Sequence, residues 1–301
     1  MMNAKPLISI VTPTRNQVHT LSGCMDSVLL QEGVGELFDL QYIVVDGGST
    51  DGSLSLIEAR RDQLHWYQSG DDDGPYDAVN QGLHQADGDI LGWLNGDDAL
   101  CPWALRTIAG VFASITDCRW LTTRNPILMD AGGQIAMVHH RPGFSSEAIL
   151  RGAHHPCSFE SLPYLQQEST FFHQELWTRV GRRIDTEYAL AGDFDLWLRM
   201  AEFSELDSVA VPLGMFRSIE GQRSSDQDRY RIEAARSLQE RRGIVMPEER
   251  PAIGWASRAQ RRITGRSLWS DECPLIEREN PGSTEAAWIR RRRSIGDRDW
   301  S

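Results

Sequence analysis

Short apolar runs alternate with amphipathic stretches through the first hundred residues, and each apolar run ends in a polar loop. Leu7 to Thr12 is a β-branched run that predicts a strand, and from Thr20 the apolar residues recur at the spacing of a helix with one buried face. Tyr42 to Val45, Trp66 with Tyr67, and Ile90 to Leu94 repeat the strand pattern. Strands separated by helices predict an α/β fold with a mostly parallel sheet flanked by helices.

The polar loops that follow these strands are the first candidates for a functional site. They comprise Pro13 to Asn16, Asp46 to Gly52, and Asn95 to Asp98. Open sheets of this class bind ligands at the carboxyl ends of their strands. We therefore expect the loops to lie together at one edge of the sheet.

Composition excludes several classes of partner. The net charge of −12 and the pI near 5.1 argue against binding to nucleic acid phosphates. The five cysteines show no C-x-x-C spacing, and no apolar run reaches the roughly 18 residues of a membrane span. We expect a cytoplasmic protein.

An acidic stretch runs from Asp71 to Asp98, with eight Asp and no Lys or Arg. It ends in Asp97 and Asp98, directly after a predicted buried strand. Carboxylates at that position can hold Mg²⁺ or Mn²⁺, which commonly bind one or two protein carboxylates together with substrate phosphate oxygens. The alternative for the Asp pair alone is a solvated acidic turn.

Three segments resemble consecutive nucleotide-binding segments of the family 2 glycosyltransferases. They are Ile8 to Asn16 (ISIVTPTRN), Val44 to Gly52 (VVDGGSTDG), and Gly88 to Asp98 (GDILGWLNGDD). Gln167 to Phe172 (QESTFF) and Ala191 to Arg199 (AGDFDLWLR) are similar to the acceptor-side region of that family. The resemblance covers about residues 7 to 225, and its specificity lies in the ordered series of motifs.

The resemblance implies a GT-A fold and a metal-dependent, inverting, hexosyltransferase-like enzyme. Its donor would be a nucleotide-diphosphate sugar, with UDP favoured, and its acceptor a saccharide or lipid-linked saccharide in surface polysaccharide or glycan biosynthesis. We accordingly expect a GT-A domain at 1–240, with a nucleotide-binding half at about 1–100 and an acceptor-binding half at about 101–240. Residues 241–301 would form a polar, Arg-rich, helical or irregular extension.

The nucleotide and metal residues follow from the same resemblance. The nucleotide site would comprise Thr12, Pro13, Thr14, Arg15, Asn16, Asp46, Gly47, Ser49, Asp51, Asp77, Asn80, Asn95 and Asp97. Asp97 and Asp98 would hold the divalent metal, Mg²⁺ or Mn²⁺, against the diphosphate. For the glycine-rich turn alone, a plain connection between strand and helix is the alternative.

Asp193 aligns with the acidic catalytic position of the resembled motif, where a carboxylate would accept the proton of the acceptor hydroxyl. A helix N-cap at Asp193 is the alternative. The acceptor site would include Glu168, Asp195 and Trp197, although Asp195 should face a different side of the helix from Asp193. A surface strand end is the other interpretation of Glu168.

Two positions depart from the family pattern. Gly47 follows Asp46 where many relatives have a second Asp, and this leaves the base contact undecided. Ile219 stands where relatives often have His, so Arg217 or Arg223 is expected to contact the diphosphate instead.

The C-terminal segment is basic. Residues 251–269 contain four Arg and no acid, and a basic amphipathic helix there could contact an anionic membrane surface or pack back on the catalytic domain. We expect residues 290–293 to belong to a mobile tail. Because the resembled motifs end before 225, a chain that ends near Gly243 is expected to fold.

Three other functions compete with that of a glycosyltransferase. A Rossmann dehydrogenase is disfavoured because G-x-G-x-x-G does not follow the first strand. A nucleotidyltransferase remains an alternative, since it too would bring metal and nucleotide to the ends of parallel strands, although a Gly-rich triphosphate loop with Lys or Arg is missing near Arg15. A non-catalytic nucleotide-sugar-binding protein of a polysaccharide assembly complex is the other alternative.

Overall fold

The first four predicted strands form the parallel half of the main sheet. β1 (Leu7–Thr14) pairs in parallel with β2 (Asp39–Asp46) on one side and with β4 (Ile90–Trp93) on the other. β3 (Trp66–Ser69) continues the parallel pairing beyond β2. The loops after these strands therefore leave from one edge of the sheet.

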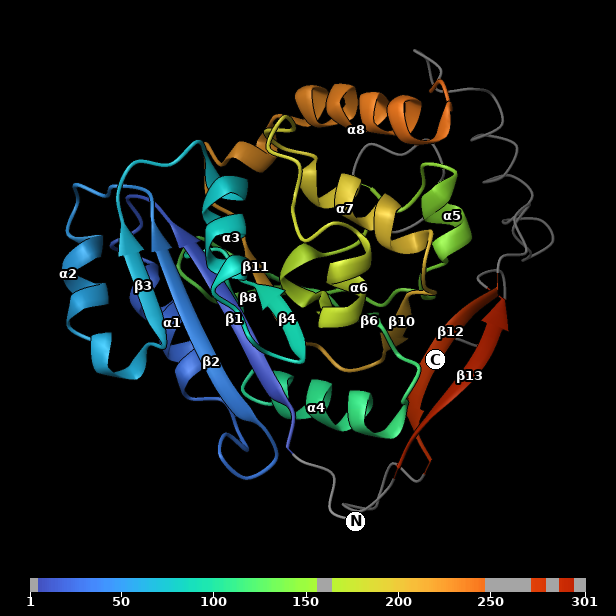
Figure 1. Ribbon diagram of the computed structural model, residues 1–301, viewed down its shortest axis with the longest axis horizontal. Coiled ribbons are helices and arrows are strands. Elements are labelled where there is room, and N and C mark those ends of the chain that lie inside the picture. Colours follow the sequence, from blue (N-terminus) through green and yellow to red (C-terminus); the bar gives the residue numbers. More distant parts are fainter. Residues whose placement is uncertain (1–4, 156–163, 247–271, 280–286, 295–301) are drawn as a thin grey trace.

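The computed structural model describes residues 5–155, 164–246, 272–279 and 287–294 (Figure 1).

The main sheet has nine strands in the order β13-β12-β10-β6-β9-β4-β1-β2-β3. Its second half consists of β6 (Trp120–Thr123), β9 (Phe171–His173), β10 (Asp207–Val209), β12 (Glu272–Arg278) and β13 (Trp288–Ser294). β9 and β13 pair antiparallel with their neighbours, and the other pairings in the sheet are parallel. The expected α/β fold with a mostly parallel sheet is confirmed.

A second, four-stranded sheet lies beside the acidic loop that follows β4. Its order is β5-β11-β7-β8, formed by β5 (Ala99–Leu100), β11 (Gly214–Arg217), β7 (Ile127–Met129) and β8 (Ile135–Val138). The pattern predicts a single strand over Val209 to Phe216, and the structure divides it between the two sheets. Pro212 lies at the division, and its missing N–H and fixed φ interrupt a continuous ladder.

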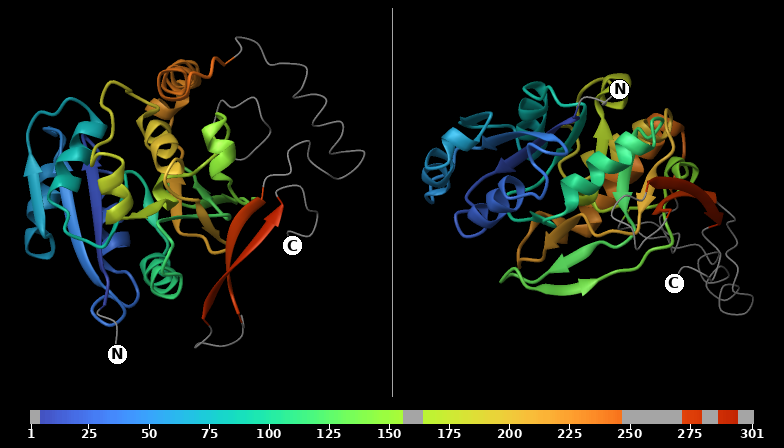
Figure 2. Two further views of the ribbon diagram at one scale, coloured as in Figure 1. Left: turned by 45° about the vertical axis from the view of Figure 1, so that its right-hand side comes forward. Right: turned by 90° about the horizontal axis from the view of Figure 1, so that it is seen from below.

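Helices cover both faces of the main sheet (Figures 1 and 2). Alternate strand residues separate two cores, because Ile43 and Val45 face one layer while Tyr42 and Val44 face the other. The layer with Ile43 holds α3 (Pro75–His84), α5 (Ser146–Leu150), α6 (Gln174–Arg179), α7 (Gly192–Ala201) and α8 (Gln227–Arg242). The opposite layer holds α1 (Leu21–Leu29), α2 (Ser53–Glu58) and α4 (Ala104–Ser114).

The described chain also contains short 3₁₀ helices. Its longest helix is α8. The 3₁₀ segments are η1 (Arg61–Gln63), η2 (Gln167–Ser169) and η3 (Arg223–Ser225). The side chain of Asp226 caps α8 by accepting from the Arg229 N–H at 3.1 Å, and Gly243 ends it with φ of 66°. The domain boundary expected at 240 lies inside this helix, two residues before its end. The division into domains stays a prediction.

The C-terminal residues that the structure describes form strands, where the sequence indicated a helical or irregular extension. β12 pairs in parallel with β10, and Cys273, Leu275 and Ile276 are buried. Figure 2 shows the β12–β13 hairpin at the end of the main sheet opposite β3. Arg290 of β13 donates to Asp207 at 2.7 and 2.6 Å. The expected mobile tail at 290–293 is therefore wrong, because ion pairs hold its arginines on the strand.

The segment expected to contact a membrane, 251–269, lies outside the described residues. Among the described helices, none has the length and apolar character to cross a bilayer.

The sequence predicts that a chain ending near Gly243 folds, and the structure adds that this chain should be less stable than the full chain. Loss of Arg290 leaves Asp207 buried without its cation, which typically costs about 3 kcal/mol or more. That corresponds to a melting temperature lower by roughly 5 °C or more in a thermal scan.

The control for this truncation is Asp207→Asn in both chains. It should lower the melting temperature of the full chain, where it weakens the pair with Arg290, and raise that of the shortened chain, where it removes an uncompensated charge. Equal melting temperatures for the full and shortened chains would show that the hairpin contributes nothing to the fold.

Candidate active site

The loops after β1 and β2 are joined by four hydrogen bonds. Each bond pairs a backbone N–H of one loop with a side-chain oxygen of the other. They run from Asn16 N to Ser49 Oγ at 2.8 Å, Thr50 N to Asn16 Oδ1 at 2.8 Å, Gln17 N to Ser53 Oγ at 3.0 Å, and Val18 N to Asp51 Oδ2 at 2.9 Å. The polar residues of both motifs therefore fix the shape of this edge before any ligand binds.

Asp46 organises the second loop from within. It is buried, and its carboxylate accepts from Ser49 N at 3.1 Å, from Ser69 Oγ at 2.6 Å, and from the Ser49 hydroxyl. A Cβ at Gly47 would lie 2.5 Å from Asp72 Oδ2, so a larger residue there would require the Asp72 side chain to move.

The residues predicted for the nucleotide site divide into groups with different contacts. Those at the carboxyl ends of β1, β2 and β4 are Pro13, Thr14, Arg15, Asn16, Asp46, Gly47, Ser49, Asp51, Asn95 and Asp97. Arg15 is exposed, and no hydrogen bond or ion pair of its side chain occurs within the described residues. Asp77 lies near the start of α3, where it accepts from Gln81 at 2.8 Å.

Two predicted nucleotide residues face the interior or another loop. The Thr12 side chain is buried, and its hydroxyl lies 3.0 Å from the Tyr42 hydroxyl, so this side chain faces the interior. A contact of Thr12 with a nucleotide stays a prediction. Asn80 accepts from Ile184 N at 2.7 Å and donates to Ile184 O at 2.8 Å. Both ends of its amide are used to brace the loop that precedes α7.

The loop after β4 holds the two carboxylates expected to bind a metal. Asp98 is buried, and its oxygens accept from Arg217 N at 2.8 Å and Asn95 Nδ2 at 3.1 Å. Burial raises the pKa of Asp98 well above its ordinary value, with the charges of Glu168 and Asp97 adding to the effect. Asp97 Oδ2 accepts from Gln222 Nε2 at 3.1 Å.

These oxygen donors fit a divalent metal bound jointly with phosphate. Among the described residues, no three His, Cys, Asp or Glu side chains cluster so that they could hold a metal by themselves. Mg²⁺ and Mn²⁺ accept one or two protein carboxylates when phosphate oxygens complete the coordination. Not every aspartate of the acidic stretch lies near this candidate metal site. Asp89 lies at the opposite edge of the sheet, where it accepts from Leu7 N at 3.0 Å.

The guanidinium groups near this loop are engaged with backbone carbonyls. Arg217 Nε donates to Asp97 O at 2.7 Å, and Arg223 donates to Ala189 O. Arg217 therefore places a positive charge beside the two carboxylates. A contact of either arginine with a diphosphate stays a prediction.

Glu168 is a buried carboxyl group beside these acids. Its side chain belongs to a residue that is 4% exposed, and its Oε1 has no hydrogen-bond partner within the described chain. Desolvation raises the pKa of Glu168 to about 8, and the charges of Asp97 and Asp193 act in the same direction. Its location in the interior excludes the alternative of a surface strand end, and its protonated form can donate a hydrogen bond near neutral pH.

Asp193 is the second residue of α7, and Ala191 is the N-cap, so the capping alternative is wrong. Asp193 Oδ1 accepts from Phe194 N at 2.7 Å and from the Tyr230 hydroxyl at 3.2 Å. Desolvation by burial raises the pKa of Asp193 from 3.8 to about 6, against the opposing effect of those hydrogen bonds. Its contribution to stability is therefore full below pH 3.8 and is lost as the pH rises through about 6.

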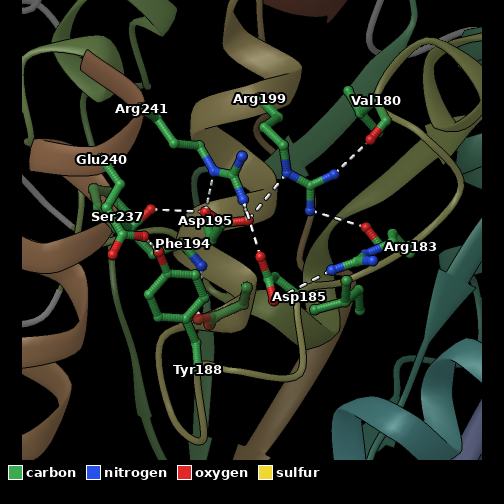
Figure 3. A network of polar contacts seen from close by, with 12 residues as sticks. Val180, Arg183, Asp185, Tyr188, Phe194, Asp195, Arg199, Ser237, Glu240 and Arg241 are labelled. Carbon is green, nitrogen blue, oxygen red and sulfur yellow. Dashed lines mark hydrogen bonds and ion pairs between the residues drawn. The ribbon is translucent and has the colours of Figure 1, made fainter. Parts of the chain in front are cut away.

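The side chains of Asp195 and Trp197, both predicted to bind the acceptor, lie in the interior, and Figure 3 shows Asp195 among arginines. Their contact with an acceptor stays a prediction. Asp195 is fully buried and accepts from Arg199 Nε at 3.0 Å, from Ser237 Oγ at 2.8 Å, and from Arg241. Trp197 is 2% exposed and stacks on Trp93 with ring centroids 5.7 Å apart. Their side chains hold α7 in place, and the expected divergence of Asp195 from Asp193 is confirmed.

Tyr76 and Glu233 are neighbours of Asp193 that the sequence motifs do not indicate. The Tyr76 hydroxyl donates to Leu190 O at 2.7 Å and accepts from Asp193 N at 3.2 Å. Glu233 Oε2 accepts from Leu190 N at 2.7 Å and Ala191 N at 3.0 Å. A Cβ at Gly192 would lie 2.7 Å from the Tyr76 ring, which explains the small residue at this contact.

Comparison with known proteins agrees with this architecture. S. aureus TarS 1–349, solved in complex with UDP-GlcNAc, matches with a TM-score of 0.58 and 17% identity over 78% of this chain and 67% of that chain. The mannosyltransferase PcManGT from Pyrobaculum calidifontis, solved with GDP-Man and Mn²⁺, matches with a TM-score of 0.50 and 19% identity over 78% of this chain and 63% of that chain. The fold is that of the GT-A glycosyltransferases.

Sequence comparison adds a family match for part of the chain. Residues 9–117 match the family model described as glycosyl transferase family 2. A PGL/p-HBAD biosynthesis glycosyltransferase from Mycobacterium tuberculosis is 36% identical over 115 residues, which cover 37% of this chain and 43% of that protein. The chain thus spans less than half of the length of the curated relatives that it matches first. The resemblance seen in the motifs is confirmed for this segment.

Proposed function

We propose that this protein transfers a sugar from a nucleotide-diphosphate sugar to a hydroxyl of a saccharide or lipid-linked acceptor, with inversion at the anomeric carbon. The observation that carries the proposal is the position of Asp193, a half-buried carboxylate at the start of α7. Hydrogen bonds connect this region to the Asp97–Asp98 loop, since Gln222 donates to Asp97 at 3.1 Å and its neighbour Arg223 donates to Ala189, just before α7. These contacts support the assignment of the loop and the candidate base to one site.

The donor would bind across the joined loops after β1 and β2. Backbone N–H groups and glycines in these loops permit close approach of a nucleoside, and Asp51 and Asn16 supply oxygen acceptors. UDP is favoured by the resemblance. TarS was solved with UDP-GlcNAc and PcManGT with GDP-Man, so the likeness in fold supports a nucleotide sugar without choosing the base.

Asp97 and Asp98 would hold the divalent ion. When bound, such an ion neutralises charge on the diphosphate as the bond to the sugar breaks. The backbone N–H of Arg217 and the amides of Asn95 and Gln222 orient the two carboxylates. The Mn²⁺ in the PcManGT complex supports this part of the proposal.

Asp193 would accept the proton of the attacking acceptor hydroxyl. It lies in the first turn of α7, and because its pKa is raised to about 6 it is a stronger base than an ordinary Asp. Attack by the hydroxyl on the face opposite the leaving diphosphate inverts the anomeric configuration. Glu168, protonated near neutral pH, can donate a hydrogen bond to an acceptor oxygen.

The acceptor class rests on relatives whose names place them in glycan biosynthesis. The mycobacterial relative is named for the biosynthesis of PGL and p-HBAD. Peripheral membrane contact through 251–269 would suit a lipid-linked acceptor, and a location in the cytoplasm or at the inner face of the membrane is proposed with it. The described residues do not include that segment.

We expect Asp193→Asn to lower sugar transfer by about 10² to 10⁴ while donor binding is kept. The amide preserves the size of the side chain but cannot accept the proton. The measurement is release of the nucleoside diphosphate from a panel of nucleotide sugars with saccharide acceptors, combined with calorimetric affinity for the same donors.

Asp195→Asn is the matched control, because it makes the same change two residues away in the buried ion-pair network. It should lower the melting temperature and leave the transfer rate of the folded protein largely intact. Full turnover in Asp193→Asn would contradict the assignment of the base. Donor binding without turnover by the unaltered protein with every donor and acceptor would favour a non-catalytic nucleotide-sugar-binding protein.

We also expect UDP to bind more tightly in the presence of Mn²⁺, and that gain to be lost in chelator and in Asp98→Asn. The physical reason is that the ion joins protein carboxylates to phosphate oxygens. Isothermal titration calorimetry with UDP should show affinity lower by at least about tenfold, a difference of 1.4 kcal/mol.

Asp89→Asn removes the same charge at the opposite edge of the sheet and should leave the effect of Mn²⁺ unchanged. An affinity that is equal with Mn²⁺, with chelator and in Asp98→Asn would exclude the metal from this loop.

A further inference from the structure

One face of α8 contacts the first turn of α7 and the residues just before it. Tyr230, Glu233, Ser237 and Arg241 are spaced three to four residues apart, so they lie on one side of the helix. Each of them hydrogen-bonds to α7 or to the residue just before it. This polar stripe makes specific contacts where most helix interfaces are apolar.

The end of the stripe nearest the candidate base holds the start of α7. Glu233 is 9% exposed, and its Oε2 receives both the Leu190 and the Ala191 N–H groups at 2.7 and 3.0 Å. Arg229, one turn earlier, donates to the other oxygen of Glu233 at 3.0 Å. Two backbone donors and one guanidinium thus fix the carboxylate, which in turn fixes the direction in which the chain enters α7.

Tyr230 contacts the candidate base itself. Its hydroxyl lies 3.2 Å from Asp193 Oδ1, and because a carboxylate only accepts hydrogen bonds, the tyrosine is the donor. The Tyr230 ring is stacked against buried His155 at 6.2 Å between centroids. The contact therefore stabilises the charged form of Asp193 and limits the rotation of its side chain.

The other end of the stripe contacts α7 at the buried carboxylate of Asp195. Arg241 donates to Asp195, and a second hydrogen bond joins its Nη2 to Asp195 Oδ2 at 3.1 Å (Figure 3). Arg241 also donates to Asp185 at 3.2 Å in the loop before α7. This end lies on the face of α7 that carries Asp195, away from Asp193, so it supplies an anchor without touching the base.

We propose that α8 is a positioning helix for the proposed base, in which Tyr230 orients the Asp193 carboxylate and Glu233 fixes the start of α7. The inference rests on the proposed role of Asp193 in transfer. A helix that merely filled space against α7 would not need a donor on the base itself.

The other titratable and charged groups that face Asp193 do not titrate in the same range as the base. Tyr76 of α3 has a pKa well above its ordinary value because of desolvation, and the pKa of Glu168 in η2 is raised to about 8. His155 behind Tyr230 has a pKa lowered to about 4 by burial. Glu233 of α8 keeps its charge near pH 6, because hydrogen bonds lower its pKa despite desolvation. The ascending limb of a rate profile near pH 6 therefore reports on Asp193.

The experiment compares the pH dependence of transfer in the full chain for Tyr230→Phe and Tyr188→Phe. Tyr188 is the matched control, since its hydroxyl donates to Glu240 of α8 at 2.7 Å and does not contact Asp193. Transfer by the unaltered protein should rise with pH through about 6. In Tyr230→Phe the midpoint should move up by about 0.5 to 1 unit, because one hydrogen bond to the charged form is lost. Tyr188→Phe should leave the midpoint in place.

A second readout does not depend on turnover. The carboxyl carbon of Asp193 can be followed by ¹³C NMR titration, with Asp193→Asn used to assign the signal. Its midpoint should move up in Tyr230→Phe and stay in place in Tyr188→Phe. An unchanged midpoint in Tyr230→Phe, or equal movement in both variants, would overturn the positioning role.

Glu233 is tested by the split between kcat and the donor KM. Glu233→Ala should lower kcat at least about tenfold with little change in the donor KM, because Glu233 accepts from the residues before α7 and not from the loops after β1 and β2. Glu233→Gln keeps an acceptor oxygen for the two backbone N–H groups and should recover most of the rate. Equal rates for the Ala variant and the unaltered chain, or no recovery in the Gln variant, would overturn the role of Glu233.

The outcomes separate the inference from the function on which it rests. Full transfer in Asp193→Asn defeats the proposed function, whatever the Tyr230 variant does. Loss of transfer in Asp193→Asn together with unmoved midpoints in Tyr230→Phe defeats the positioning role alone.

Discussion

The rest of the structure depends on how its interior carboxylates are neutralised. Some of them form ion pairs with arginines and others do not. Asp195 and Asp207 are buried against arginines, at Arg199 and Arg241 in the first case and at Arg290 in the second. These pairs join α7 to α8 and the C-terminal hairpin to the sheet. Removing one partner of such a pair leaves a charge in the interior, so the paired acids determine which segments must fold together.

Asp98 and Glu168 are also buried and Asp193 is half-buried, but in the described part of the chain none of them forms an ion pair. They are held by backbone N–H groups, amides and hydroxyls, and Glu168 Oε1 has no hydrogen-bond partner there. The pKa of each is raised chiefly by desolvation. Keeping these acids together costs stability, and the proposed proton transfer and cation binding would account for that cost.

Much of the first half of the fold could be predicted because its sequence follows the periodicity of strand and helix. The alternation from Leu7 to Leu94 and the polar loops at the strand ends correspond to β1 to β4 and the helices between them. The stripe of α8 escaped this kind of analysis because it is polar, so the apolar spacing that marks a helix is weak there. The C-terminal hairpin was missed for a related reason, since its arginines pair with acids far away in sequence, such as Asp117 and Asp207.

The candidate site was predictable at the level of motifs and less so at the level of side chains. Asp193 and Asp195 share one motif, yet helix geometry directs one toward Tyr230 and the other into the arginine network. Thr12 and Trp197 belong to motifs that form the site, and their own side chains support it from the interior. A motif identifies a segment, whereas tertiary packing decides which of its residues reach a ligand.

The central claim is that the loops after β1, β2 and β4 and the start of α7 form one catalytic site. A crystal structure of the protein with UDP and Mn²⁺, with the anomalous signal of manganese recorded, tests it most directly. The account predicts a manganese peak at coordinating distance, about 2.2 Å, from a carboxylate oxygen of Asp97 or Asp98, with UDP over the first two loops and Asp193 facing the diphosphate. Manganese and nucleotide bound away from these carboxylates would contradict it.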